Sequence, residues 1–311
     1  MKVTYDDIMT AHERIKDTIY ETPIVRLYHL EETLGCHAYA KLENTQLTHS
    51  FKIRGVLNAI RKLSTDELSR GVIAGSSGNH GQAVSYIAKL LNIPCTIVVP
   101  NTASPFKVDK IKNNGAHLVF CPSEERTEVA NRIAKEEGLT LISSADHEDI
   151  IAGQGTIGLE LNESDIDFSH VVVPMSGGGL LSGIALAVKE GNSNAQVIGV
   201  ESNQIPRFTT SVKNDEITLV ETKETIADAL ILNKPGVITF DLVKAYVDEL
   251  VAVDDEASLK KARRMLLDSQ KILAEHSSSI GIAACLEGKL KFSPEDHVCF
   301  VISGGNTLLD F

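Results

Sequence analysis

Short apolar runs alternate with amphipathic segments between residues 71 and 142, and this alternation restricts the fold more than any other feature of the chain. The apolar runs have the length of strands and are found at 72–74, 95–99, 118–121 and 139–142. The segments between them have helical spacing and cover 82–91, 105–114 and 124–137. Because consecutive parallel strands need a long crossover connection, usually a helix, the alternation predicts a parallel, doubly wound α/β sheet.

The rest of the chain contains similar elements in a less regular order. Further strands are expected at 38–42, 171–174, 196–200 and 298–302. Further helices are expected at 5–18, 149–161, 181–189, 254–273 and from about 278 onward, whereas 202–235 has no clear pattern. A chain of 311 residues is long enough for two domains.

The composition excludes several kinds of partner. A formal net charge of −12 argues against nucleic acids and membrane surfaces, since both require basic patches. No apolar run approaches the length of a membrane span, and the N-terminus lacks the apolar core of a secretory signal. The five cysteines are scattered singly, which is typical of reduced thiols. We therefore expect a cytoplasmic protein that binds neither nucleic acid nor a membrane.

Lys52 follows a short polar turn and precedes a segment with helical apolar spacing, 53–62. Ser50 is placed to cap this helix. A lysine in the first helical turn feels the positive end of the helix dipole, which favours a neutral amine. A neutral amine can form a Schiff base with a carbonyl compound. The alternative is an ordinary solvated lysine at a helix start.

A glycine-rich run, SGGGL at 176–180, lies between the predicted strand 171–174 and the helix 181–189. Strand, glycine turn and helix start together form a site for an anion such as phosphate. One alternative is a plain tight turn. Another is a dinucleotide site, because Gly177 and Gly179 nearly match the GxGxxG pattern and Glu201 ends the next strand.

Two more polar loops follow predicted strands, at 76–81 and 303–306. The first offers hydroxyls, an amide and helix-start N–H groups, which together can bind a carboxylate, although such loops are often only polar caps. Ligands in open α/β sheets bind at the carboxyl ends of strands. Three such loops and Lys52 therefore predict a single cleft that binds a phosphorylated carbonyl cofactor.

Several motifs resemble one enzyme family, in the same order and over almost the whole chain. They are SFKIRG at 50–55, SGNHGQ at 77–82, IAGQGT at 151–156, SGGGL at 176–180 and SGGN at 303–306. The family is that of the fold-type II pyridoxal-phosphate enzymes, in the serine/threonine dehydratase and serine racemase branch. The resemblance implies an α/β fold of two doubly wound open sheets, similar to the tryptophan synthase β-subunit. It also implies a large domain (1–65 and 148–311), a small domain (66–147) and a homodimer.

The resemblance also implies roles for individual residues around pyridoxal 5′-phosphate. Lys52 would form a Schiff base with the cofactor and act as the base at the substrate Cα. The other residues expected to bind the cofactor are Phe51 at the ring, Asn79 at the phenolic oxygen, Ser176, Gly177, Gly178, Gly179 and Leu180 at the phosphate, and Ser303 at the pyridine nitrogen. The residues expected to bind the amino-acid substrate are Ser76, Ser77, Gly78, Asn79, His80 and Arg126.

The expected reaction is the β-elimination of a β-hydroxy amino acid, such as threonine or serine, to a 2-oxo acid and ammonia. Because Ser303, unlike an aspartate, cannot hold a protonated pyridine nitrogen as an ion pair, the cofactor would be a weaker electron sink, which suits prompt loss of the hydroxyl better than a long-lived carbanion. Ser77 and Arg126 resemble the racemase branch, in which such a serine is a second acid and base. TIAD at 225–228, KPG at 234–236 and YVDE at 246–249 instead resemble bacterial threonine dehydratases. An amino-acid racemase of serine or aspartate type is therefore the alternative.

The chain departs from the family pattern at His49, at Ala229, at SSADH (143–147) and at HSSS (276–279). Because several departures fall where the substrate pocket of the family lies, a 3-hydroxyaspartate dehydratase is a further alternative. The divalent-cation site of the family uses an acid like Glu201 and a second acid shortly after it. This chain has a cation, Arg207, at about the place of the second acid, so we predict no activating metal. A non-catalytic binding protein with the same fold is the rival from another class.

Overall fold

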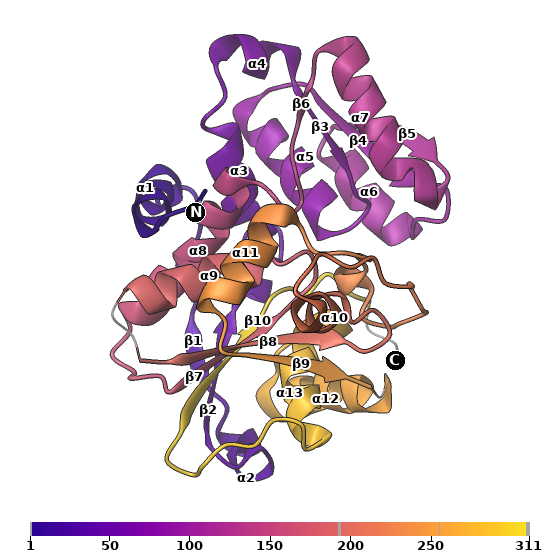
Figure 1. Ribbon diagram of the computed structural model, residues 1–311. Coiled ribbons are helices and arrows are strands. Elements are labelled where there is room, and N and C mark those ends of the chain that lie inside the picture. The colour runs from indigo at the N-terminus through magenta and orange to yellow at the C-terminus, as the bar shows by residue number, and fades with distance from the viewer. Residues whose placement is uncertain (1, 192–193, 255, 309–311) are drawn as a thin grey trace.

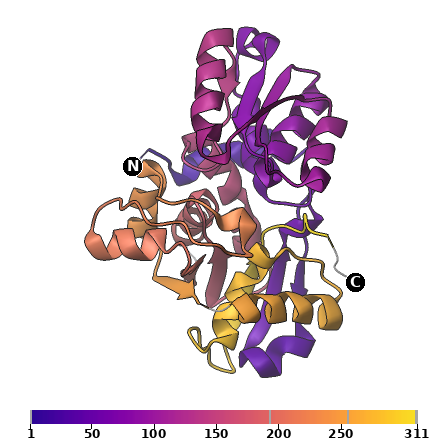
Figure 2. The same ribbon diagram turned by 90° about the vertical axis from the view of Figure 1, so that its right-hand side faces the viewer.

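The computed structural model describes residues 2–191, 194–254 and 256–308. Within these residues the chain forms a six-stranded and a four-stranded sheet, which lie in two lobes (Figures 1 and 2). The order of the larger sheet is β1 (Ile24–Arg26), β2 (His37–Leu42), β10 (His297–Ile302), β7 (His170–Pro174), β8 (Gln196–Ser202) and β9 (Glu249–Val253). The order of the smaller sheet is β5 (His117–Cys121), β4 (Cys95–Pro100), β3 (Val72–Gly75) and β6 (Thr140–Leu141).

Strand pairing is parallel in both sheets except where β1 runs antiparallel to β2. The carboxyl ends of neighbouring strands therefore lie along one edge of each sheet. In the larger sheet, for example, Cys299 of β10 lies between Tyr39 of β2 and Val171 of β7. The prediction of two parallel-type α/β sheets is confirmed.

Helices connect and cover the two sheets. The first seven are α1 (Tyr5–Ile15), α2 (Glu31–Leu34), α3 (Lys52–Ile60), α4 (Thr65–Arg70), α5 (Asn79–Leu91), α6 (Pro105–Asn113) and α7 (Arg126–Glu137). The others that the structure describes are α8 (Glu148–Asn162), α9 (Gly179–Glu190), α10 (Arg207–Asn214), α11 (Val237–Tyr246), α12 (Glu256–Gln270) and α13 (Ile280–Leu286). Short 3₁₀ turns include η3 (Ser123–Glu125), η4 (Asp228–Leu230) and η5 (His276–Ser279).

Helix α8 is buried along most of its length and packs tightly against α3 and α9. A Cβ atom on Gly153 of α8 would lie 2.5 Å from the Cα atom of Gly55 in α3. A Cβ atom on Gly183 of α9 would lie 2.5 Å from the main-chain oxygen of Ile151. Only glycine permits helices to approach this closely. These contacts hold α3, and with it Lys52, against the centre of the molecule.

The apolar face of α3 lies in the core of the smaller sheet. Ile53, Val56, Leu57 and Ile60 are in one buried cluster with Val72 and other residues of that lobe. The strands of the smaller sheet lie within 72–141, and those of the larger sheet lie outside that range. Helix α3 lies outside the predicted small domain, 66–147, yet it packs against both lobes. The domain bounds of 66 and 147 therefore stay a prediction.

The structure differs from the expected elements in several places: β1, α2, α4 and α11 were not expected, α1 ends at Ile15, and the differences described next bear on the site. Ser50 is not the cap of α3: the N-cap residue is Phe51, whose N–H donates to the main-chain oxygen of Ser303 at 3.1 Å. Helix α5 begins three residues earlier than expected, so Asn79 lies in its first turn. The stretch 202–235 contains α10 and η4, and β9 follows in a segment for which no strand was predicted.

Candidate active site

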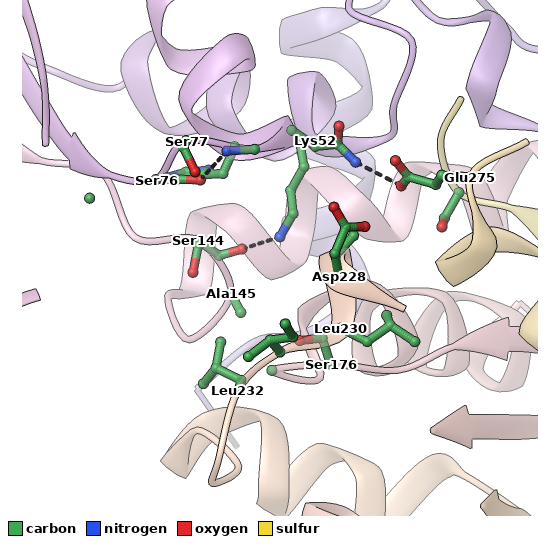
Figure 3. Close-up of a pocket in the computed structure, with 18 of the residues that line it drawn as sticks. Lys52, Ser76, Ser77, Ser144, Ala145, Ser176, Asp228, Leu230, Leu232 and Glu275 are labelled. Carbon is green, nitrogen blue, oxygen red and sulfur yellow. Dashed lines mark hydrogen bonds between the residues drawn. The ribbon is translucent and has the colours of Figure 1, made fainter. Parts of the chain in front are cut away.

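A pocket of about 510 Å³ opens between the two lobes, at the carboxyl ends of strands from both sheets. The residues that line it include every residue that the sequence assigned to cofactor or substrate, from Phe51 and Lys52 to Arg126 and Ser303. Figure 3 shows Lys52 at its centre, with the side chain of Ser176 below it. The fold thus brings all the predicted residues together, while their individual roles stay predictions.

Lys52 is the first residue of α3, and its Nζ atom donates to the main-chain oxygen of Ser144 at 2.7 Å (Figure 3). Burial lowers the pKa of this amine to about 8, although the nearby carboxylate of Glu275 acts in the opposite direction. With this pKa, roughly a tenth of the amine is neutral at pH 7. Burial thus favours the neutral amine, and this cause was not apparent from the sequence.

Helices α5 and α9 both begin at the pocket, after the glycines Gly78 and Gly178. No side chain among the described residues caps either helix, whereas α1 and α4 have complete capping boxes. Their first N–H groups therefore remain available to an anion, and the helix dipoles favour negative charge there.

Neighbouring residues pack closely against the glycine run that precedes α9. Gly178 has φ +91°, and a Cβ atom on it would lie 2.6 Å from Cζ of Phe208. Thr239 donates its hydroxyl to the main-chain oxygen of Gly177 at 2.8 Å. A Cβ atom on Gly177 would lie 2.8 Å from that of Ala145. This support leaves the loop one well-defined backbone conformation in which to bind a phosphate.

Asn79 lies between two polar partners from the larger lobe. Its Nδ2 atom donates to Oε1 of Glu275 at 2.8 Å, and its Oδ1 atom accepts from Nδ2 of Asn306 at 2.8 Å. Glu275 was not predicted as a site residue, and its only signal in the sequence was its place before the 276–279 turn. Burial raises the pKa of its carboxyl to about 7, with a further contribution from the negative charge of Asp228.

His80 is held as a neutral ring. Its Nε2 atom lies 2.9 Å from the main-chain oxygen of Ile142, which can only accept, so Nε2 carries the hydrogen. Burial is the main cause that lowers the pKa of His80 to about 3, and the positive charge of Lys52 adds to it. No described residue is a hydrogen-bond partner of its Nδ1 atom.

Arg126 reaches the pocket from the start of α7. Its Nε atom is buried, and no described residue accepts a hydrogen bond from it. The described acids form no ion pair with its guanidinium group. A second cation, Lys107 of α6, is by contrast paired with Asp228 across the pocket.

Some of the residues that depart from the family pattern line the pocket, and others do not. His49 is exposed, has φ +56° and does not line the pocket, so it affects the turn before Lys52 rather than the ligand. Ala229, Ser144 and Ala145 do line it. In the 276–279 turn, the hydroxyl of Ser278 lies 3.0 Å from that of Ser303 and thus supports a predicted cofactor contact.

Glu201 and Arg207 are both fully buried, with Nε of Arg207 3.9 Å from Oε2 of Glu201. The carboxylate also accepts the N–H groups of Phe208 at 3.1 Å and Thr209 at 2.8 Å. Among the described residues no group of three His, Cys, Asp or Glu could hold a metal ion. The lack of an activating metal stays a prediction. In the described chain, no helix is both long and apolar enough to span a bilayer.

Residues 15–304 match the family described as pyridoxal-phosphate dependent enzymes. The chain belongs to this family. An L-threonine ammonia-lyase of Thermotoga maritima is 42% identical over 306 residues, which cover 98% of this chain and 76% of the relative. An L-threo-3-hydroxyaspartate ammonia-lyase of Saccharomyces cerevisiae is 38% identical over 305 residues, which cover 97% and 93%.

The family is also evident in three dimensions. Serine racemase from Dictyostelium discoideum superposes with a TM-score of 0.89 at 36% identity, covering 99% of this chain and 100% of that chain. The protein is therefore a fold-type II pyridoxal-phosphate enzyme, as its motifs predicted. The residues present fit this cofactor, because the pocket contains a buried amine of lowered pKa and a glycine loop at the start of α9.

Proposed function

We propose that the protein is an ammonia-lyase that removes the β-hydroxyl and the amine from a β-hydroxy amino acid such as threonine or serine. The products are a 2-oxo acid and ammonia. The observation that carries this proposal is one pocket that holds a buried amine, on Lys52, and the starts of α5 and α9. The start of α9 suits the cofactor phosphate, and the start of α5 suits the substrate carboxylate.

Different residues around the pocket would hold different parts of the cofactor. Lys52 would hold it through the amine, residues 176–180 would bind its phosphate, and Phe51 would pack against its ring. Asn79 would donate to the phenolic oxygen, and Ser303 would contact the ring nitrogen. When bound, the cofactor supplies an electron sink for the substrate Cα.

Lys52 would perform the proton transfer at the substrate. Once the substrate has taken the place of the lysine at the cofactor, the free neutral amine of Lys52 would take the proton from Cα, and a pKa of about 8 suits this role at neutral pH. The bond between Cβ and the hydroxyl oxygen then breaks, and the hydroxyl leaves as water with a proton that the ammonium of Lys52 would return. The released enamine is hydrolysed to the 2-oxo acid and ammonia. The main-chain oxygen of Ser144 orients the amine.

The substrate carboxylate would bind at the start of α5. Ser76, Ser77, Gly78 and Asn79 offer hydroxyl, amide and main-chain donors there. Since His80 is neutral, the helix start rather than an imidazolium supplies the positive potential at this end of the pocket.

An amino-acid racemase is a second candidate, and the position of Ser77 favours it. Inversion at Cα requires a proton donor on each face of the substrate. Ser77 and Lys52 both line the pocket, as Figure 3 shows, and Ser77 is thus available as the second donor.

Arg126 favours a substrate with a second carboxylate. Within the described chain its buried Nε atom has no acceptor, and an unpaired buried donor is costly. The β-carboxylate of 3-hydroxyaspartate would satisfy it, and the yeast relative is named for this substrate.

A substrate panel tests these alternatives. The holoenzyme is incubated with L-threonine, L-serine and the 3-hydroxyaspartates, while 2-oxo acid and D-enantiomer are followed together. The proposal predicts faster formation of 2-oxo acid, and Arg126→Met lowers kcat/KM for 3-hydroxyaspartate more than for threonine. If the D-enantiomer accumulates faster and Ser77→Ala stops it selectively, the racemase assignment replaces the lyase assignment.

The assembly is proposed on the resemblance, and the location on the five singly scattered cysteines, which are typical of reduced thiols. The protein would act as a cytoplasmic homodimer, with domain bounds at 66 and 147. Light scattering coupled to size-exclusion chromatography tests the dimer, and a monomer at micromolar concentration would contradict it.

A further inference from the structure

A chain of three side-chain hydrogen bonds runs from α6 to the pocket. Lys110 Nζ donates to Asn306 Oδ1, Asn306 Nδ2 donates to Asn79 Oδ1, and Asn79 Nδ2 donates to Glu275 Oε1, each at 2.8 Å. The four residues come from α5, α6, the segment before η5 and the segment after β10. Each of the three hydrogen bonds therefore joins one lobe to the other.

The side-chain amide of Asn306 has only one favourable orientation. The ammonium of Lys110 can only donate, and the main-chain oxygen of Thr48, which accepts from Asn306 Nδ2 at 2.8 Å, can only accept. Turning the amide of Asn306 by 180° would place donor against donor and acceptor against acceptor. Because Asn306 is almost fully buried, water cannot replace the lost partners.

The orientation of Asn306 then determines that of Asn79. Since Nδ2 of Asn306 faces Asn79, the nearer atom of Asn79 must be the acceptor Oδ1, and its Nδ2 atom faces Glu275. Glu275 alone would not settle this choice. Its carboxylate accepts, but its protonated form donates, and its pKa of about 7 leaves both forms populated at neutral pH.

We propose that Asn306, oriented by Lys110, is a positioning residue that sets the amide orientation of Asn79, so that the second hydrogen on Asn79 Nδ2 is available to the cofactor. The inference rests on the proposed function, in which Asn79 donates to the phenolic oxygen. Asn306 does not line the pocket, so it acts through Asn79.

The rival explanation is that Asn306 only fixes the C-terminal segment through its bond to Thr48. That role predicts a loss of stability and no change in the cofactor. The two explanations differ in the visible absorbance of the bound cofactor, whose pH dependence reports on the donor at its phenolic oxygen.

The test uses the holoenzyme and three variants. Asn306→Asp offers only acceptors to Asn79, so the amide of Asn79 turns and its Nδ2 atom leaves the cofactor. Lys110→Glu replaces the donor to Asn306 Oδ1 with an acceptor and should turn both amides in the same way, and it does so at a side chain that is only partly buried. Lys112→Glu is the matched control, because it makes the same charge change at an exposed position of α6.

Absorbance is recorded from pH 6 to 9, and cofactor affinity is measured by titrating the apoprotein. We expect Asn306→Asp and Lys110→Glu to shift the midpoint of the absorbance change and to weaken cofactor binding about 3- to 10-fold, the loss of one hydrogen bond. Lys112→Glu and the wild type should agree. If Lys110→Glu retains both the wild-type midpoint and affinity, the inference is wrong.

Asn79→Ala separates this failure from failure of the proposed function. A wild-type protein without a visible band overturns both. A band that shifts in Asn79→Ala but not in Lys110→Glu overturns the role of Asn306 alone. A band that is unchanged in Asn79→Ala also overturns it, because Asn79 is then no contact of the cofactor.

Discussion

Lys52 Nζ lies 2.7 Å from the main-chain oxygen of Ser144, which comes from the segment that connects the two sheets. The next residue, Ala145, packs under Gly177 of the glycine run. Asp146 accepts the first N–H groups of α11, those of Val237 and Ile238, at 2.9 Å each. One short segment therefore positions both the amine and the loop that is proposed to bind the phosphate.

Replacement of Gly178 should weaken cofactor binding. In Gly178→Ala the new Cβ would overlap Phe208 and Thr239, and φ of +91° is unfavourable for alanine. Relief of the overlap moves the loop, so we expect cofactor affinity to fall by about tenfold or more. Equilibrium titration with the cofactor measures it.

Gly115→Ala is the control for backbone strain. Gly115 has φ +86°, and its Cβ would have no neighbour within 4 Å. We expect a loss of about 1 kcal/mol in the free energy of unfolding and unchanged cofactor affinity. Equal losses of affinity in the two variants would contradict a specific role for Gly178.

Glu275 should make the stability of the apoprotein depend on pH. Its folded-state pKa of about 7 is above the ordinary glutamate value of 4.5, so the folded state binds the proton more tightly. Its unfavourable contribution is therefore absent below pH about 4.5 and grows as pH rises towards 7. Glu275→Gln should thus be more stable than wild type at pH 8, by about 1–3 kcal/mol, and not at pH 4.5. Urea unfolding at the two pH values measures this, and an equal difference at both would contradict it.

Arg54 should be essential for stability. Its guanidinium group is fully buried and bonds to Glu43 at 2.8 Å and to Glu160 at 2.9 Å. Arg54→Met leaves two buried carboxylates without this partner, so we expect a loss of about 3–5 kcal/mol in the free energy of unfolding. Arg132→Met, which removes an arginine paired with the exposed Glu136, should cost less than about 1 kcal/mol. Similar losses in denaturant unfolding would contradict this difference.

Much of the fold follows from local patterns. The alternation between 71 and 142 predicted β3 to β6 with helices between them, because apolar periodicity is a local property. The motif loops were correctly expected to meet in one cleft, because the carboxyl ends of parallel strands meet at one edge.

Other features depend on contacts between distant segments. Ser50 has a good capping side chain, but a bridge to Gly304 and the bond from Phe51 to Ser303 place it before the helix start instead. The contact of Asn79 with Glu275 joins residues 196 positions apart, so no spacing in the sequence indicates it. Only the packing of the two lobes brings these groups together.

The most direct measurement concerns Lys52. The purified protein is loaded with pyridoxal 5′-phosphate, treated with borohydride and digested, and the modified peptide is identified by mass spectrometry. If Lys52 forms the Schiff base, the protein has a visible band that borohydride bleaches and a reduced cofactor attached to Lys52, and Lys52→Ala has no band. A colourless protein, or a cofactor attached to another lysine, would show that Lys52 is not the residue that binds the cofactor.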